Sequence, residues 1–302
     1  MVWRSVMINQ PAKLKREHSS LVVEQAQSAS VPFEDIAVII LNHREITMTH
    51  PVLSACAEYG IGLYSTGENH QPNGLFLPFL QHSRATRMQR LQLNLDKPTA
   101  KRAWARIVQA KISNQAKCMN LLKINDTERL ESYVRRIQSG DKENLEAQAS
   151  AYYFPKVFGK GFFRNQSIWI NSALNYGYAI MRGACARGVV AHGFLPSFGL
   201  FHKSEQNSFN LADDLIEPFR PIIDLHVASM PHRPESDLLT PSDKVNLIGL
   251  LNVDVAMPRG SMNVLSAIEQ ASESLARLFN GGNEISLELP ILLGLQQHHH
   301  EM

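Results

Sequence analysis

The spacing of the apolar residues changes once along the 302-residue chain, close to residue 80. Before that point, apolar residues come in short runs bounded by polar or turn residues, which is typical of β-strands. A short helix is expected over 52–59, and Gly60 is expected to end it. Residues 66–78 are rich in glycine, proline and asparagine, which indicates a loop or hinge. Strands are expected over residues 4–8, 20–24, 36–41, 46–49 and 61–65.

After residue 80 the pattern is helical. Arg84, Arg87 and Arg90 recur every three residues, and Pro98 begins a long amphipathic stretch over 99–122. Further helices are expected over residues 126–138, 142–153, 166–187, 211–219, 241–252 and 261–279. The second part of the chain should therefore fold as a set of packed helices.

These patterns predict an α+β fold of two domains. A small N-terminal β-rich domain, residues 1–75, precedes a larger, mostly α-helical domain, residues 76–302, which ends in a flexible C-terminal tail. The short apolar segment 289–295 could pair as a strand or dock on a partner, but packing on the chain's own core is favoured. The histidines at 298–300 are native or the remnant of an expression tag, and they are left out of the metal-site arguments.

The composition is that of a globular protein, 44% hydrophobic and 19% charged, with enough apolar residues for a sizeable core. No run of about 18 apolar residues is present, so a membrane span is not expected. The N-terminus lacks the basic start, apolar run and cleavage site of a secretory signal. Cys56, Cys118 and Cys185 are odd in number and far apart, which argues against a disulfide framework and favours a reducing cytoplasm.

Charge is distributed unevenly along the chain, although the net value is only +2. Residues 82–203 carry twenty Lys and Arg against seven Asp and Glu, a net charge of +13, whereas residues 204–302 have a net charge of −9. This asymmetry suggests a surface that faces a polyanion, and a solvated basic helix face is the alternative. On a nucleic-acid surface, the expected phosphate contacts are Arg84, Arg87, Arg90, Arg102, Arg106 and Lys111, with Arg164 nearer the candidate site described next.

Possible metal ligands gather around residues 202–217. Apolar residues at 211, 215 and 219 predict a short helix from one side of which Asp214 and Glu217 project. His202 lies twelve residues before Asp214, so a tight loop could return it to this helix. A nitrogen donor with hard oxygen donors suits Mn²⁺ or Mg²⁺ better than a closed zinc site. The alternative is a histidine that is simply hydrogen-bonded or at the surface.

A further ligand must come from elsewhere in the chain, and residues 141–155 are the best candidate region. Leu145 and Ala149 lie on one helical stripe. Glu146 is next to that stripe among small residues, where its carboxylate could turn inward. The alternative is an ordinary exposed helix glutamate.

Several segments occur in one order along the chain, and together they resemble the CRISPR-associated spacer integrases, the "Cas one" family. Segments 32–39, 59–63 and 72–74 resemble the N-terminal β domain of that family. The resemblance covers roughly residues 1–285, and the form of segment 213–221 looks most like the version from type II systems. In the second domain it is carried by Glu146 with Ala149 and 152–154, by 164–165, 171–178, 195–202 and 213–221.

The resemblance implies a metal-dependent DNA endonuclease and integrase. Glu146, His202 and Glu217 would be catalytic and would hold Mg²⁺ or Mn²⁺, with Asp214 as a further ligand close by. In the implied reaction, the 3′-hydroxyl of a short DNA fragment, the spacer, attacks a phosphodiester of the CRISPR repeat and displaces a 3′-oxygen. One phosphodiester replaces another, so no ATP is required, and the sequence contains no Walker-A or GxGxxG motif.

The same resemblance implies the partners. They are double-stranded DNA, a second copy of the chain bound through the N-terminal domain, and a small CRISPR-associated protein, "Cas two", that bridges two homodimers. Two other functions remain open from the residues. One is a metal-dependent DNA or RNA nuclease of other biology, in which water takes the place of the 3′-hydroxyl. The other is a nucleic-acid-binding module without catalysis, in which Glu146, His202 and Glu217 are structural.

Overall fold

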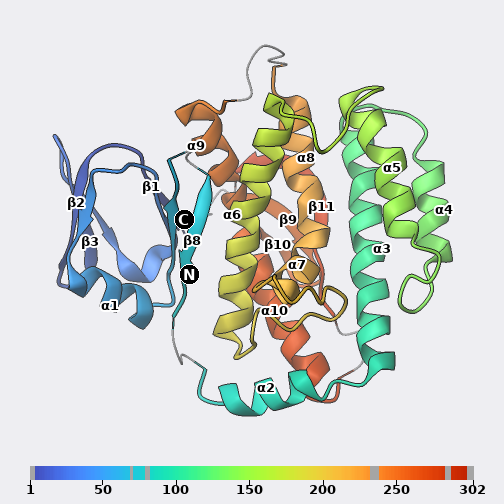
Figure 1. Ribbon diagram of the computed structural model, residues 1–302, viewed down its shortest axis with the longest axis horizontal. Helices are drawn as coiled ribbons and strands as arrows, with labels where there is room; N and C mark the ends of the chain where they lie inside the picture. Colours follow the sequence, from blue (N-terminus) through green and yellow to red (C-terminus); the bar gives the residue numbers. More distant parts are fainter. Residues whose placement is uncertain (1–3, 69–70, 79–81, 232–237, 283–286, 298–302) are drawn as a thin grey trace.

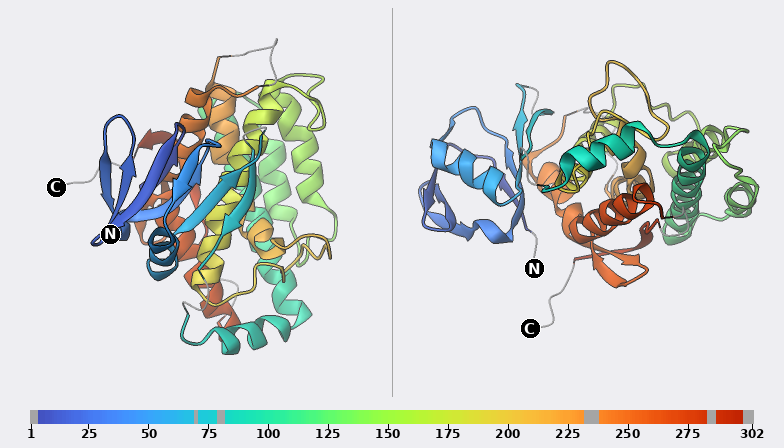
Figure 2. Two further views of the ribbon diagram at one scale, coloured as in Figure 1. Left: turned by 60° about the vertical axis from the view of Figure 1, so that its left-hand side comes forward. Right: turned by 90° about the horizontal axis from the view of Figure 1, so that it is seen from below.

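The computed structural model describes residues 4–68, 71–78, 82–231, 238–282 and 287–297 (Figure 1). The histidines at 298–300 lie outside these residues. Strands dominate the first part of the chain and helices the second, so the expected α+β class is confirmed. Figure 2 shows the N-terminal sheets at one end of the molecule and helices α4 (Glu128–Arg136) and α5 (Leu145–Phe158) at the other.

Two four-stranded sheets form the N-terminal part. The inner sheet has the order β1-β5-β7-β8, with strands β1 (Arg4–Ile8), β5 (Ile36–Leu41), β7 (Gly62–Thr66) and β8 (Pro72–Phe76). The outer sheet has the order β4-β3-β2-β6, with strands β2 (Ala12–Glu17), β3 (Ser20–Glu24), β4 (Ala29–Pro32) and β6 (Ile46–Met48). Helix α1 (His50–Glu58) packs on β2, and η1 (Phe33–Asp35) leads into β5.

The prediction of a loop throughout 66–78 was wrong, because Pro72–Phe76 is strand β8, paired antiparallel with β7. Proline is tolerated there because β8 is at the edge of its sheet. Gly74 allows the two strands to approach closely, since a Cβ at this position would lie 2.3 Å from the Ser65 hydroxyl. Residues that usually form turns, Pro72 and Gly74, are therefore part of the edge strand β8.

The inner sheet joins the two parts of the molecule. On β5, Ile36 and Ile39 pack into a core shared with the outer sheet, whereas Val38 and Ile40 pack into the core of the helices. The Tyr64 hydroxyl of β7 donates to the Ile180 carbonyl at 2.9 Å, inside helix α6 (Trp169–Ala191). Buried contacts of the inner sheet therefore join the N-terminal part to the helices.

Helix α6 runs through the centre of the helical part, and α2 (Ala85–Leu93) crosses below it (Figure 1). Helix α8 (Arg220–Ser229) packs between α6 and α3 (Lys97–Leu121). After α6 come α7 (Asn210–Ile216), η2 (Glu217–Phe219), α8 (Arg220–Ser229), α9 (Pro241–Gly249), η3 (Leu250–Asn252) and α10 (Val264–Phe279). Most predicted helices are present with small shifts of their ends. Helix α8 was not predicted.

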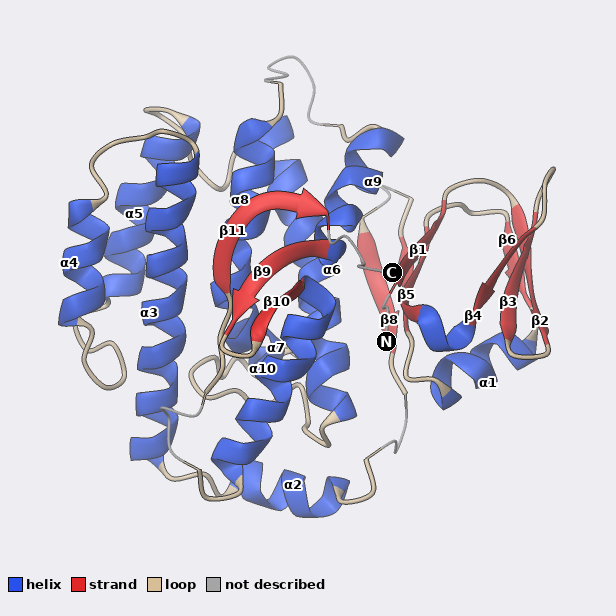
Figure 3. Ribbon diagram, turned by 180° about the vertical axis from the view of Figure 1, so that it is seen from behind, coloured by secondary structure: helices blue, strands red, loops and turns tan. Residues whose placement is uncertain are grey.

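A second departure from the sequence prediction is a small C-terminal sheet of order β10-β9-β11. Its strands are β9 (Val253–Met257), β10 (Gly260–Asn263) and β11 (Ile291–Gln297), and it covers the face of the helical part that Figure 3 shows at the front. The expected flexible tail is therefore a paired strand as far as Gln297. The segment packs on the chain's own core, where Leu292 is buried.

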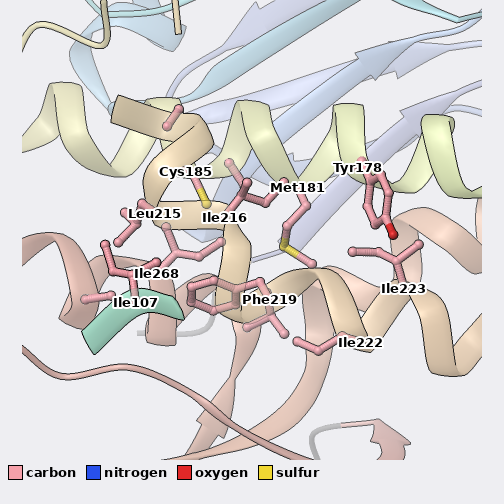
Figure 4. Close-up of a cluster of buried hydrophobic side chains, with 14 of the residues drawn as sticks. Ile107, Tyr178, Met181, Cys185, Leu215, Ile216, Phe219, Ile222, Ile223 and Ile268 are labelled. Carbon is pink, nitrogen blue, oxygen red and sulfur yellow. The ribbon is translucent and has the colours of Figure 1, made fainter. Parts of the chain in front are cut away.

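Apolar side chains fix the direction of the α7–η2–α8 segment. Figure 4 shows α6 facing this segment across a continuous core, and the labelled side chains are Ile107, Tyr178, Met181, Cys185, Leu215, Ile216, Phe219, Ile222, Ile223 and Ile268. Pro218 and Pro221 lack the N–H that a continuous helix needs, so the chain changes direction between α7 and α8. Glu217 stands at this bend.

Within the described residues, no helix combines the length and apolar character needed to cross a bilayer. Cys56, Cys118 and Cys185 are buried free thiols.

Asn114 of α3 ties the bend to the C-terminal sheet. Its Nδ2 donates to the carbonyls of Pro218 at 2.8 Å and Pro290 at 3.0 Å, and its Oδ1 accepts from the Leu292 amide at 3.0 Å. All of these groups are buried, so the amide satisfies three polar atoms from two other segments at once.

We expect Asn114→Ala to lower the free energy of unfolding by roughly 2–4 kcal/mol, because three buried polar groups lose their partner. Denaturant unfolding measures the change. Asn120→Ala, at an exposed position of the same helix, is the control and should cost less than about 0.5 kcal/mol. Equal losses in the two variants would contradict this role for Asn114.

Candidate metal centre

Glu217 is a buried carboxylate at the bend between α7 and α8. Its Oε1 accepts from Nε of Arg220 at 2.9 Å, and its Oε2 lies 2.5 Å from Nζ of Lys111. Burial alone would raise the pKa of this carboxyl, but Arg220 and Lys111 outweigh it and lower the pKa to about 2. Glu217 is therefore an ionised ligand group at any physiological pH.

Glu146 approaches Glu217 from a different element, the first turn of α5. The turn before α5 positions it, because the Asp141 carboxylate accepts from the amides of Leu145 at 2.9 Å and Glu146 at 3.0 Å. Oε1 of Glu146 lies 2.6 Å from Nζ of Lys111. Two carboxylates far apart in the sequence thus meet across one ammonium group.

Lys111 is central to this arrangement and is not a surface phosphate contact, contrary to the expectation from its charge. Its side chain is only 9% exposed, and its Nζ pairs with both glutamates. Burial lowers the pKa of Lys111, but Glu217 and Glu146 overcome this and raise it above its usual value. The lysine is therefore a permanent cation between the two acids.

His202 is held by Asp214. The Asp214 carboxylate accepts from three successive amides, those of Leu200, Phe201 and His202, and its Oδ1 lies 2.7 Å from Nδ1 of His202. Since an ionised carboxylate only accepts, Nδ1 carries the hydrogen and Nε2 is the free nitrogen. In this structure these four contacts occupy both oxygens of Asp214, and the carboxylate positions the imidazole.

The loop that carries His202 depends on close packing around this carboxylate. A Cβ on Gly199 would lie 2.5 Å from the His202 carbonyl and 2.7 Å from Oδ2 of Asp214, so only glycine fits. Phe201 stacks on Trp104 of α3 with ring centroids 4.3 Å apart. The bond to Asp214 is also the main reason that the pKa of His202 is raised.

The candidate ligands suit a divalent ion in kind but not in their present spacing. Among the described residues, no three His, Cys, Asp or Glu side chains lie close enough together to hold a metal ion as they stand. Glu146 and Glu217 face each other across Lys111, and His202 is near enough to influence the pKa of Glu217. Two carboxylates and an imidazole with its other nitrogen fixed are donors that suit Mg²⁺ or Mn²⁺. Holding such an ion would require Lys111 to leave its present place and the three ligands to move closer together.

A cavity of about 140 Å³ lies beside Glu217, and Arg164 lines it. Arg164 donates to Asn171 at 2.7 Å and Asn175 at 2.8 Å, which fixes its guanidinium. The Arg164 and Arg220 guanidinium carbons lie 5.3 Å and 4.6 Å from the centroid of the Tyr178 ring. The residues lining the cavity are Lys111, Gln115, Phe154, Arg164, Tyr178, Glu217, Arg220 and Asp224. Two fixed guanidinium groups beside a carboxylate suit a phosphodiester.

The other predicted phosphate contacts lie away from this cavity. Arg84, Arg87 and Arg90 are exposed on α2 and the turn before it. Arg102 is exposed on α3, where it donates to the Thr99 hydroxyl. Arg106, also exposed on α3, lines a separate cavity of about 920 Å³ between α3 and the C-terminal sheet. A third cavity, of about 630 Å³, reaches His202 from the ends of α2 and α3.

Comparison with known proteins identifies the family. The family profile "CRISPR associated protein Cas1" matches residues 6–239. The "CRISPR-associated endonuclease Cas1" of Neisseria meningitidis serogroup C (strain 8013) is 41% identical over 305 residues, which span 100% of both chains. A Thermus thermophilus protein, "CRISPR-associated endonuclease Cas1 1", is 34% identical over 125 residues, 37% of this chain and 39% of that protein. The chain therefore belongs to the Cas1 family of CRISPR-associated proteins.

Solved structures share the fold. "Casposase bound to integration product" superimposes with a TM-score of 0.74 at 19% identity, covering 93% of this chain and 92% of the other. A Cas1 protein from Thermotoga maritima gives a TM-score of 0.73 at 15% identity, covering 92% and 97%. At this level of identity, the likeness concerns the fold alone.

Asp224, a buried carboxyl group beside the site, should make the stability of the fold depend on pH. Burial raises the pKa of this carboxyl from near 3.8 to about 6, and the hydrogen bond from Tyr178 opposes the shift. Between these pH values, the folded protein keeps a proton that the unfolded chain has lost. The folded state therefore loses about 1–3 kcal/mol of stability as the pH rises from 4 to 6.

Asp224→Asn removes this titration. We expect the stability of the variant, relative to the native chain, to rise by the same amount over that pH window, as measured by denaturant unfolding. A difference between the two proteins that stays constant with pH would contradict the assignment.

Proposed function

We propose that this Cas1-family protein is a metal-dependent DNA integrase and endonuclease that inserts short DNA fragments into a CRISPR array. The observation that carries the proposal is the meeting of Glu146 and Glu217 across one cation, beside a cavity lined by Arg164 and Arg220. Acidic groups that gather around a cation next to fixed guanidinium groups suit chemistry on a phosphodiester.

Each residue has a defined part in this proposal. Glu146, Glu217 and Nε2 of His202 hold Mg²⁺ or Mn²⁺, which when bound neutralises charge on the phosphoryl oxygens and favours ionisation of the attacking hydroxyl. Asp214 keeps the imidazole in the correct tautomer and orientation. Arg164 and Arg220 contact the non-bridging oxygens of the phosphate that reacts.

The reaction exchanges one P–O bond for another. A 3′-oxygen of the incoming fragment forms a bond to phosphorus and loses its proton, while the bond from phosphorus to the displaced 3′-oxygen breaks and that oxygen gains a proton. The number of phosphodiesters is unchanged, so no nucleotide cofactor is needed. With water as the attacking group, the same site would cleave DNA.

Two observations support the proposed partners, namely the exposed arginines of this chain and the solved complexes of proteins with the same fold. Exposed arginines on α2 and α3 would contact the phosphates of double-stranded DNA. Solved structures of this fold include "Crystal structure of TtCas1-DNA complex", with a TM-score of 0.56, and "Cas6-RT-Cas1--Cas2 complex", with a TM-score of 0.72. We propose that residues 1–75 form the homodimer contact, that residues 76–302 carry catalysis, and that a Cas2 protein bridges two dimers in the cytoplasm.

Strand transfer distinguishes this proposal from the alternatives. The protein is incubated with a supercoiled plasmid carrying a CRISPR repeat, a short duplex and Mn²⁺. Joined product is expected, whereas cleavage alone would favour a nuclease of other biology. Unchanged DNA-dependent activity in Glu146→Ala and His202→Ala would indicate a binding module without catalysis.

Glu217→Gln keeps the shape of the side chain but removes its charge. We expect the strand-transfer rate to fall at least about 100-fold, because several kcal/mol of transition-state stabilisation depend on the ion it would hold. DNA binding should be unchanged in a gel-shift measurement. Glu143→Gln, at an exposed glutamate just before α5, is the control and should retain activity. A fully active Glu217→Gln variant would contradict the proposal that Glu217 holds the metal ion.

Neutralising Arg84, Arg87 and Arg90 together tests the DNA surface. We expect weaker binding to every duplex sequence, and a salt dependence of the affinity whose slope falls by about one for each phosphate that the protein no longer neutralises. Fluorescence anisotropy at several salt concentrations measures both quantities. Arg44→Ala, at an exposed arginine between β5 and β6, is the control. If the salt dependence of the affinity is the same in the triple variant, these arginines do not contact DNA.

A further inference from the structure

The metal site of the proposed function already contains a cation. We propose that Lys111 is a built-in counter-ion, which holds Glu146 and Glu217 in place before metal binds and then moves to Gln115 when the metal ion takes its position. This inference rests on the proposed function, and it assigns a positioning residue and a competitor for the metal within that site.

The ammonium group of Lys111 is in contact with both carboxylates. Nζ of Lys111 lies 2.6 Å from Glu146 and 2.5 Å from Glu217, so one ammonium group occupies the space between the two carboxylates. The Lys111 side chain is 9% exposed, and those of Glu217 and Glu146 are 5% and 21% exposed. An ion that binds both carboxylates must therefore replace the ammonium.

The charges around Glu217 already balance without a metal ion. Arg220 also contacts Glu217, so the two acids and these two cations form a neutral group. A divalent ion added to a neutral group would leave a double positive charge in a buried position, which is unfavourable. Moving the ammonium away from the acids lowers that cost. Arg220 need not move, because it contacts Oε1 of Glu217 and Lys111 contacts Oε2.

Gln115 gives the displaced ammonium a destination. It lies one turn after Lys111 on α3, is 1% exposed, and lines the same small cavity as Lys111. Its Oε1 is buried and has no hydrogen-bond partner among the described residues. A buried acceptor without a donor is costly, and an ammonium group that swings toward it would satisfy it.

The test measures Mn²⁺ affinity in DNA-free protein by electron paramagnetic resonance. Lys111→Met keeps the length of the side chain without its charge, and we expect it to bind Mn²⁺ at least about tenfold more tightly, because a competing charge in contact with both ligands is gone. Lys117→Met, at an exposed position of the same helix, is the control and should bind as the native chain does. Equal or weaker affinity in Lys111→Met would overturn the proposal.

Gln115→Met provides the second readout and leaves the ionic contacts of Lys111 intact. We expect it to weaken Mn²⁺ binding about threefold or more in the native background, since the displaced ammonium loses its acceptor. In the Lys111→Met background the same change should have no effect. If Lys111→Met does not fold, an unchanged affinity in Gln115→Met alone is enough to reject the proposal.

The outcomes separate this inference from the proposed function. Mn²⁺ bound with the same affinity by the native chain, Lys111→Met and Gln115→Met would reject the counter-ion and leave the metal site standing. Absence of Mn²⁺ binding in the native chain and in Lys111→Met would reject both.

Discussion

The ion pairs of Lys111 with Glu146 and Glu217 are the interaction on which the site depends. Glu217 is buried, and a buried charge without a partner is costly because its desolvation costs several kcal/mol. Lys111 and Arg220 supply the cations that offset this cost. The lysine therefore keeps the first turn of α5 and the bend at Glu217 close together. The same contacts explain how a site rich in acids can fold before any metal is present.

The surrounding fold restricts each member of this group independently. Asp141 fixes the first turn of α5 beneath Glu146, the proline-bounded bend presents Glu217, and Asp214 orients His202. Asn114, on the same face of α3 as Lys111, binds the bend and the C-terminal sheet to that helix. The catalytic proposal therefore rests on a frame whose parts come from four separate segments of the chain.

Local patterns in the sequence predicted what depends on local spacing. The helical stripe through α3 and the carboxylates at 214 and 217 were found because their partners lie within a few turns. Lys111 was wrongly predicted to lie at the surface, because its partner Glu146 is 35 residues away in the sequence. The spacing of residues along one helix gives no information about a pair so far apart. Strand pairing of the segment that forms β11 was only one of the alternatives for the same reason, since its partner β9 lies on the other side of helix α10 in the sequence. Spacing also cannot show that backbone amides contact both oxygens of Asp214.

The central claim is that Glu146, His202 and Glu217 hold one divalent ion. Anomalous diffraction from a crystal of the native chain soaked in Mn²⁺ tests it most directly. The account predicts one strong peak at about 2.0–2.3 Å from an oxygen of each glutamate and from Nε2 of His202, the distances usual for such ligands. A soaked crystal without a peak there, in which Lys111 still bridges the two glutamates, would contradict it.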